Sequence, residues 1–293
     1  MRVIKTVITI IYYNMRKVFL TIALYLFPVI VLNAQNLHLG VFGGFSNYQG
    51  DLQNAKFTFS QAKGAFGAGA TYEISERFYV RLNFVTGKVS GNDKTSETNK
   101  SRNLSFTSPI TELHLGLEYD LFNVYQKGFS IYLFAGIGGF KFNPSTIDSL
   151  GNKVYLQPLG TEGQGFYQGR KKYSLNSMVI PFGGGLKLPL NEDIFLRLEA
   201  GVRKTFTDYL DDVSTTYANR EALLVNNGPK AVELSFRGDE LTPPISYPNE
   251  GAIRGSPKRT DYYYIIGASI SFRLKPKNDT GGKSKTGCPV NVY

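Results

Sequence analysis

The last regular stretch of the chain, Asp261–Leu274, most restricts the possible folds. Every even-numbered residue from Tyr262 to Leu274 is apolar, whereas most odd-numbered ones are small or polar. Side chains alternate between the two faces of an extended strand, so the pattern predicts a strand with one apolar face. Its 14 residues exceed the usual globular strand of about 5–6. They suffice to cross a bilayer at a tilt, which takes roughly 9–11 residues.

The same alternation recurs upstream, which gives eight predicted strands. They are Leu37–Tyr48, Gly64–Ile74, Arg77–Gly87, Leu104–Leu121, Phe129–Phe142, Met178–Leu190, Ile194–Phe206 and Asp261–Leu274. Their connections run long, short, long, short, long, short, long. We expect Lys88–Asn103 to be a solvated loop, Asn143–Asn176 a long polar insertion, and Asp208–Thr260 the longest connection, rich in turns.

Alternating loop lengths are typical of outer-membrane barrels, which have short periplasmic turns and longer extracellular loops. We therefore predict an all-β fold, an eight-stranded antiparallel transmembrane β-barrel of the outer-membrane type with long extracellular loops. The alternative is a secreted sandwich or lipocalin-like barrel, which would bury the apolar faces inward. Strand length and the N-terminal segment favour the membrane barrel, and hence localisation to the outer membrane.

The N-terminus resembles an export signal. Arg16 and Lys17 precede an apolar run, Val18–Leu32, and Ala34 is a small residue suited to cleavage. We predict a signal peptide over 1–34, with 15–34 as its functional part, a barrel over 35–274 and a flexible periplasmic tail over 275–293. An uncleaved membrane anchor is the alternative, although the run is shorter than the roughly 18–20 residues of a spanning helix.

Composition restricts the possible partners and redox chemistry. The chain has 31 Gly, 19 Tyr and 21 Phe, as expected for strands and aromatic girdles. Its net charge of +10 could indicate nucleic acid, but Lys and Arg are scattered and form no recognised binding motif. We expect no nucleic-acid partner, and outer-membrane lipid as a surrounding partner. The single cysteine, Cys288, excludes an intrachain disulfide.

Charged residues lie on the strand faces opposite to the apolar ones. An eight-stranded barrel is just wide enough inside for side chains to fill it, and buried charges persist where they are paired. We predict an ion-pair network that plugs the lumen, with a gated ion path as the alternative. The predicted members are Arg81, Glu112, His114, Glu118, Lys187, Arg197, Glu199, Arg203 and Arg273.

The sequence gives little support for catalysis. The two histidines, His38 and His114, both fall on predicted lumenal positions, whereas a lipid hydrolase would need a histidine near a serine at the rim or the lipid-facing surface. No spacing of His, Cys and carboxylates indicates a metal site, and no glycine-rich turn into a helix indicates a phosphate site. We therefore predict no enzymatic activity, no catalytic residues, no metal and no cofactor.

Two stretches resemble a known family. Tyr48-Gln49-Gly50-Asp51-Leu52 follows the first strand, and RNLSFTSPITEL, from Arg102 to Leu113, leads into the fourth. Both are similar to the PorG-type outer-membrane barrels of Bacteroidetes, which are associated with type IX protein secretion. The resemblance implies a rim position for the motif residues. These are Gly50, Asp51, Arg102, Asn103, Ser108 and Pro109.

The resemblance also implies a function. A PorG-type barrel is expected to be an integral outer-membrane component that docks on a periplasmic ring built from a lipoprotein and its partner protein. We therefore predict a non-enzymatic anchor or scaffold in protein secretion. Two alternatives are an adhesion or binding barrel acting through its extracellular loops, and a lipid-modifying enzyme.

Overall fold

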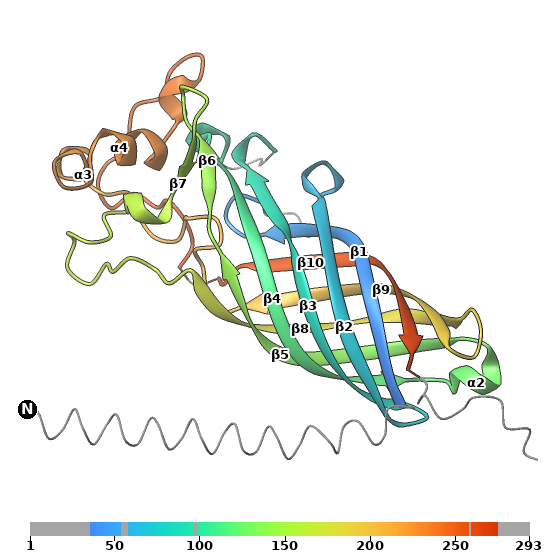
Figure 1. Cartoon of the computed structure of the whole chain (residues 1–293). Helices are drawn as coiled ribbons and strands as arrows, with labels where there is room; N and C mark the ends of the chain where they lie inside the picture. Colours follow the sequence, from blue (N-terminus) through green and yellow to red (C-terminus); the bar gives the residue numbers. More distant parts are fainter. Residues whose placement is uncertain (1–35, 54–57, 96–98, 258, 275–293) are drawn as a thin grey trace, which may run out of the picture.

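The computed structural model describes residues 36–53, 58–95, 99–257 and 259–274. The predicted signal peptide, the predicted tail and Cys288 lie outside these residues. Eight long strands form the barrel wall: β1 (Leu37–Gln49), β2 (Lys63–Ser75), β3 (Phe78–Asn92), β4 (Ser105–Asp120), β5 (Ser130–Phe142), β8 (Asn176–Pro189), β9 (Ile194–Thr205) and β10 (Tyr262–Arg273). They follow the order β3-β2-β1-β10-β9-β8-β5-β4, and β3 also pairs with β4. The predicted eight-stranded antiparallel transmembrane barrel of the outer-membrane type is therefore confirmed (Figure 1).

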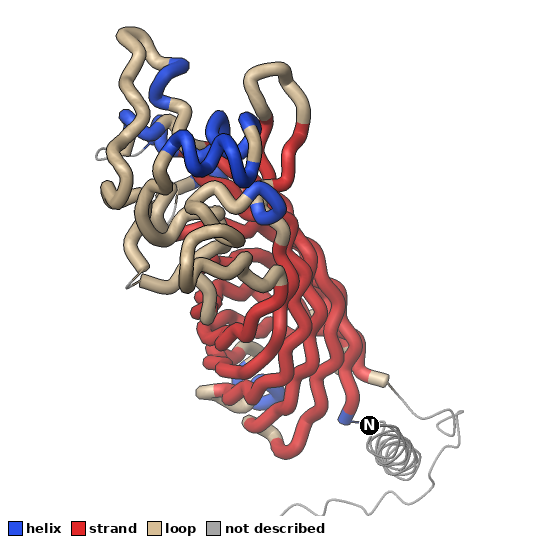
Figure 2. Tube along the Cα trace, turned by 90° about the vertical axis from the view of Figure 1, so that its left-hand side faces the viewer, coloured by secondary structure: helices blue, strands red, loops and turns tan. Residues whose placement is uncertain are grey.

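The two ends of the barrel differ. At the inner end, short turns join β2 to β3 and β8 to β9, and a connection holding the one-turn helix α2 (Val124–Lys127) joins β4 to β5. Asn123 caps α2 by accepting hydrogen bonds from the Tyr125 and Gln126 amides. At the outer end lie the long connections, and Figure 2 shows most of the helices and loops gathered there. No helix among the described residues is long and apolar enough to cross a membrane.

Residues 143–175 and 206–261 fold together at the outer end into what we call the cap. The predicted insertion 143–176 contains a small hairpin, and the predicted turn-rich loop 208–260 contains helices. Cap elements are β6 (Ser145–Ile147), β7 (Lys153–Tyr155), α3 (Arg220–Asn227), α4 (Pro229–Ser235) and the 3₁₀ helices η5 (Gln157–Leu159) and η6 (Gly238–Glu240). In α3 the Asn219 side chain accepts from the Ala222 amide, and Leu223 is fully buried. The sequence analysis did not predict these short helices and this hairpin within the two long connections.

The β3–β4 connection is shorter than predicted. Lys88 pairs with Pro109 and Asn92 pairs with Ser105, so β3 continues beyond Gly87 to Asn92, while β4 begins at Ser105, next to its predicted start. Two short 3₁₀ helices, η3 (Asp93–Thr95) and η4 (Lys100–Arg102), lie in this connection, and a third, η2 (Phe59–Gln61), precedes β2. Polar composition concealed the extension of β3, because alternation is hard to recognise where both faces carry polar residues.

The barrel wall has an apolar exterior. Leu113, Leu115 and Leu117 on β4 are 54%, 53% and 60% exposed, while Glu112 and Glu118 on the same strand are buried. Exposed aliphatic and aromatic side chains recur at outward positions of all eight strands. This arrangement suits a lipid environment, because strands of a membrane barrel turn their apolar residues to the acyl chains.

The interior of the barrel is apolar at the outer end and charged toward the inner end. At the outer end, the inward residues Phe106 and Ile110 of β4 join an apolar core that continues into the cap through Leu210 and Leu234. From Glu112 inward, the lumen is charged. The barrel therefore contains an apolar core beneath the cap and a polar core near the inner end.

Candidate functional site

The lumenal residues are positioned by strand register. Glu118 on β4 has no exposed side-chain surface, and it meets cations from three other strands. Arg81 lies 3.4 Å from it and Lys187 2.8 Å, while Arg197 donates a hydrogen bond to it. Lys187 also lies 2.7 Å from Asp120. A single buried carboxylate thus connects β3, β4, β8 and β9.

A second carboxylate links this cluster to the middle of the barrel. Arg81 contacts Glu199 at 2.7 Å, and Arg203 lies 3.9 Å from Glu199 and 3.7 Å from Glu112. Glu112 accepts a 2.6 Å hydrogen bond from Tyr263 and lies 2.6 Å from the His114 ring. Eight of the nine predicted lumenal residues therefore lie in one connected network.

Arg273 does not join that network. It pairs with Glu73 at 3.0 Å near the inner end, where His38 lies 3.5 Å from the same glutamate. Tyr125 of α2 accepts a further hydrogen bond from Arg273. The predicted set lacked two acidic partners, Asp120 of the network and Glu73 of this separate cluster. Both occupy inward positions of their strands in the alternating pattern, so the sequence contained the signal for them.

Aromatic rings fill the space between the lumenal charges. The Arg81 guanidinium lies 4.5 Å from the centre of the Phe134 ring, and the Lys187 ammonium lies 3.8 Å from that of Tyr79. Glycines leave room for these groups. A Cβ atom on Gly185 would lie 2.5 Å from the Tyr132 ring, and one on Gly201 would lie 2.5 Å from the Arg203 guanidinium. The narrow lumen is therefore packed with side chains.

The rim residues lie at the outer end, and several tie loops together. Arg102 donates two 2.7 Å hydrogen bonds to the Asp93 carboxylate and one of 3.0 Å to the Asp51 carbonyl. It also donates to the Arg254 carbonyl, 152 residues away in the sequence. Arg102 thus joins three separate connections, β1–β2, β3–β4 and β9–β10.

The other rim residues have more local contacts. Asn103 adopts a left-handed backbone with φ of 55° and donates to the Arg237 carbonyl at 3.0 Å. The Asp51 carboxylate accepts from the Ser256 amide at 2.9 Å, and the Ser108 hydroxyl accepts from the Asn143 amide at 3.1 Å. Gly50 directly follows the end of β1, and Pro109 lies within β4, opposite Lys88 of β3. A Cβ on Gly50 would lie 2.0 Å from the Tyr48 hydroxyl, so no larger residue fits there without rearrangement.

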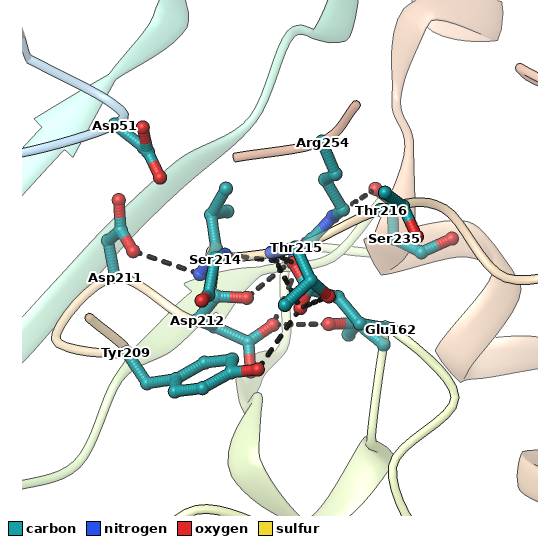
Figure 3. A network of polar contacts seen from close by, with 12 residues as sticks. Asp51, Glu162, Tyr209, Asp211, Asp212, Ser214, Thr215, Thr216, Ser235 and Arg254 are labelled. Atoms are coloured by element: carbon teal, nitrogen blue, oxygen red, sulfur yellow. Dashed lines mark hydrogen bonds and ion pairs between the residues drawn. The ribbon is translucent and has the colours of Figure 1, made fainter. Parts of the chain in front are cut away.

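The cap contains a buried carboxylate that the sequence analysis did not identify. Glu162 has no exposed side-chain surface and accepts hydrogen bonds from the amides of Ser214 and Thr215, the Thr215 hydroxyl and the Tyr209 hydroxyl (Figure 3). Arg254 donates to it at 3.0 Å. Burial of a carboxylate is tolerated because its oxygens are so fully satisfied.

Arg254 extends these contacts to Asp212, and we call Glu162, Arg254, Asp212 and their hydrogen-bond partners the cap network. It donates to the Asp212 carbonyl at 2.6 Å and to the Ser235 carbonyl at 3.1 Å, which connects it to the end of α4. The Asp212 carboxylate accepts from the Thr161 and Tyr173 hydroxyls at 2.6 and 2.7 Å. Burial nevertheless raises the pKa of Asp212 to about 6.

Further acidic groups lie beside this network. Burial raises the pKa of Asp208 to about 8 and holds the pKa values of Asp211 and Asp261 well above the usual range. The Tyr48 hydroxyl donates to Asp211 at 2.5 Å and lies 3.1 Å from Asp261. Among the described residues, no cluster of His, Cys and carboxylates is arranged to hold a metal ion.

The two histidines lie inside the barrel, at its inner end and middle. His38 is 6% exposed and His114 is 2% exposed, and each is adjacent to a glutamate. The Nε2 atom of His114 contacts the Asn83 side chain at 3.1 Å. Neither histidine therefore lies on the outer surface where a membrane lipid would reach it.

Comparisons with known proteins give one family match and several matches to solved structures. A family profile described as Domain of unknown function (DUF6089) matches residues 16–231. No curated protein sequence is significantly similar to the chain. Among solved structures, Neisserial surface protein A is 8% identical with a TM-score of 0.41, covering 82% of this chain and 97% of that one.

Two further barrels are similar at the same level. Ail, the attachment invasion locus protein of Yersinia pestis, is 10% identical with a TM-score of 0.37, covering 80% of this chain and 97% of that one. The outer membrane protein OprG from Pseudomonas aeruginosa is 12% identical with a TM-score of 0.36, covering 82% and 98%.

Proposed function

This chain belongs to the family described as Domain of unknown function (DUF6089), and from that premise we propose that it is a non-conducting anchor in the outer membrane that holds components of a protein-secretion machine. The observation that carries the proposal is the filled lumen. Arg81, Glu118 and Lys187 meet near the inner end, and an apolar core closes the outer end. A barrel packed in this way has no open passage for solutes, so its surfaces are the parts available for function.

The type IX assignment and the periplasmic partners come from the PorG-type resemblance. The rim residues lie at the outer end and are engaged in bonds within the chain, so they do not supply a periplasmic docking surface. We place the docking surface at the inner end, around α2. Exposed apolar side chains gather there, among them Leu121, Phe122 and Phe129, which are 39%, 37% and 39% exposed. A lipoprotein and its ring partner would meet this end in the periplasm.

The experiment is deletion of the gene in its host, followed by measurement of cargo export and by affinity capture from detergent-solubilised outer membrane. We expect export to fall and the native chain to restore it, with periplasmic ring proteins co-purifying. Phe122→Glu should weaken capture of these proteins. Leu150→Glu is the matched control, because Leu150 is an 80% exposed residue of the β6–β7 turn at the opposite end. Normal export in the deletion strain would refute the secretion role.

A surface-binding role is the second candidate. The cap displays three strongly exposed aliphatic side chains, Leu150, Val225 and Ile253, at 80%, 83% and 82%. If binding through the cap is the function, Leu150→Glu should reduce attachment while export remains normal. The proposal includes no catalytic step, because His38 and His114 are enclosed in the lumen. An unchanged lipid A mass in the deletion strain would agree with that view, and a changed mass would contradict it.

A further inference from the structure

A groove of about 610 Å³ opens on the outside of the barrel, near its outer end. Its floor is the outward face of β3 and β4, around Ser90 and Thr107. One side is formed by η2 and the start of β2, and the other by the β6–β7 hairpin. We call it the basic groove.

The charge of this groove has a single sign. Three lysines line it, Lys63, Lys88 and Lys153, and its lining includes no acidic residue. None of the three forms an ion pair with a described residue; the Lys153 ammonium lies 4.9 Å from the Tyr155 ring centre. The remaining lining is rich in hydroxyl groups. The Ser90 and Ser145 hydroxyls already donate to backbone carbonyls, so the unpaired ammonium groups are the part of the lining suited to bind phosphate oxygens.

The basic groove lies at the outer margin of the lipid-facing belt. Lys88 pairs with Pro109. Four residues closer to the inner end, Phe84 pairs with Leu113, and these two residues are exposed and apolar. Four residues of a strand span about 13 Å. Lys141 on β5 and Lys204 on β9 are also exposed beyond the last apolar outward residues of their strands. The groove is therefore at the depth where headgroups of the outer leaflet meet the barrel.

A second groove, of about 490 Å³, lies on the outer face of the barrel wall, nearer to the inner end than the basic groove. We call it the wall groove. Small residues of β2, Ala68 and Ala70, form its floor, and Leu39, Leu82 and Phe84 stand around it. Its lining contains no charged residue. Both grooves include residues of β3 and β4, so an acyl chain could run along these strands toward the inner end from a headgroup in the basic groove.

We propose that the two grooves together bind a phosphorylated glycolipid of the outer leaflet. The lysines Lys63, Lys88 and Lys153 contact its phosphate groups, and the wall groove holds one of its acyl chains. Charge complementarity with unpaired lysines favours an anionic headgroup, and the adjacent apolar groove favours a lipid over a free anion. The site lies on the barrel exterior and is separate from both the cap network and the inner end.

The test uses the full mature chain, folded in detergent micelles, with bisphosphorylated lipid A as the probe. We expect saturable binding in native mass spectrometry and at least tenfold weaker binding of dephosphorylated lipid A. The triple variant Lys63→Gln, Lys88→Gln, Lys153→Gln should lose about 100-fold in affinity, since each lysine near an anionic surface contributes about fivefold. The charge-matched variant Lys127→Gln, Lys141→Gln, Lys204→Gln should change affinity by no more than about threefold.

Further measurements test the role of the wall groove and distinguish lipid A from other sources of phosphate. Ala68→Phe fills the wall groove on its exposed side and should weaken lipid A binding by about tenfold. The heat-modifiable gel shift shows that each variant is folded. Equal loss in the two triple variants, equally strong binding of phosphatidylglycerol, or displacement of lipid A by about 10 mM inorganic phosphate would overturn the proposal.

Discussion

The inner half of the lumen and the cap both bury charged groups, but they satisfy them differently. In the lumen, carboxylates meet cations of other strands, as Glu118 meets Arg81, Lys187 and Arg197. In the cap, Glu162 is held largely by the amides and hydroxyl of one short segment, Ser214–Thr215, with a single cation. The lumenal contacts are between side chains, whereas the cap contacts depend on backbone conformation.

This difference has a consequence for stability. The wall strands fix the lumenal positions, so loss of one lumenal charge should affect unfolding of the whole barrel. The cap network fixes the loops, so its loss should open the cap locally and leave the barrel intact.

Glu118→Gln should have the largest effect. It leaves three buried cations without their shared carboxylate, and breaking a buried ion pair costs about 3–5 kcal/mol. We therefore expect Glu118→Gln to unfold at a lower urea concentration than the native chain, with the heat-modifiable gel shift as the readout of unfolding. Glu192→Gln, in the exposed turn between β8 and β9, is the control. Equal midpoints for the two variants would show that the lumenal network does not stabilise the barrel.

A rise in pH should destabilise the cap selectively. The pKa of Asp212 is about 6 in the folded protein, above the ordinary value of 3.8. A raised folded pKa contributes stability that is complete below about pH 4 and is lost as the pH rises through 6. The difference amounts to about 3 kcal/mol at pH 8.

This loss is measurable as faster hydrogen exchange in the cap between pH 4 and 8, after correction for intrinsic exchange rates. Asp212→Asn is the matched variant, because it cannot ionise. Its cap stability should depend less on pH than that of the native chain. Identical pH dependence in the two proteins would exclude Asp212 as the responsible group.

Glu162→Gln should act on the cap with a smaller effect. Glutamine keeps one carbonyl oxygen as an acceptor but loses the charge that pairs with Arg254, at a cost of about 2 kcal/mol. Amide exchange at Ser214 and Thr215 should accelerate, while the urea midpoint of the barrel stays unchanged. A lowered barrel midpoint would mean that the cap and the lumen unfold together.

Glu240→Ala should have the smallest effect. Glu240 pairs with Arg237 at 2.7 Å across one turn, and its side chain is 35% exposed. Such surface pairs contribute about 0.5 kcal/mol or less. Cap exchange rates should therefore change by about twofold or less. A change as large as that of Glu162→Gln would show that surface pairs hold the cap as strongly as the buried carboxylate does.

Strand parity allowed much of the lumen to be predicted. Alternation alone placed Glu112 and Glu118 opposite the exposed leucines of β4, and the same rule reaches Asp120, which the predicted network omitted. The alternation of residues along a strand does not predict which cation pairs with which carboxylate. Arg273 lies on an inward face as the others do, yet it pairs with Glu73 near the inner end because of its height along the barrel axis.

Sequence patterns did not predict the contacts that hold the cap together. Glu162 lies in a segment of glycines and polar residues without any period, and its partners lie 47 to 92 residues further along the chain. Arg102 was identified from a family motif, but its contact with the Arg254 carbonyl was not. Such contacts form only once closure of the barrel has brought the long connections to the same end.

Local sequence patterns were enough to predict the strands, their apolar and polar faces, and hence a membrane barrel with charges inside. These follow from a local period of two, which any window of the chain displays. Tertiary structure alone decided the ion-pair partners, the folded cap and the basic groove. Each of these depends on the register between strands and on loops that approach one another in space while lying far apart along the chain.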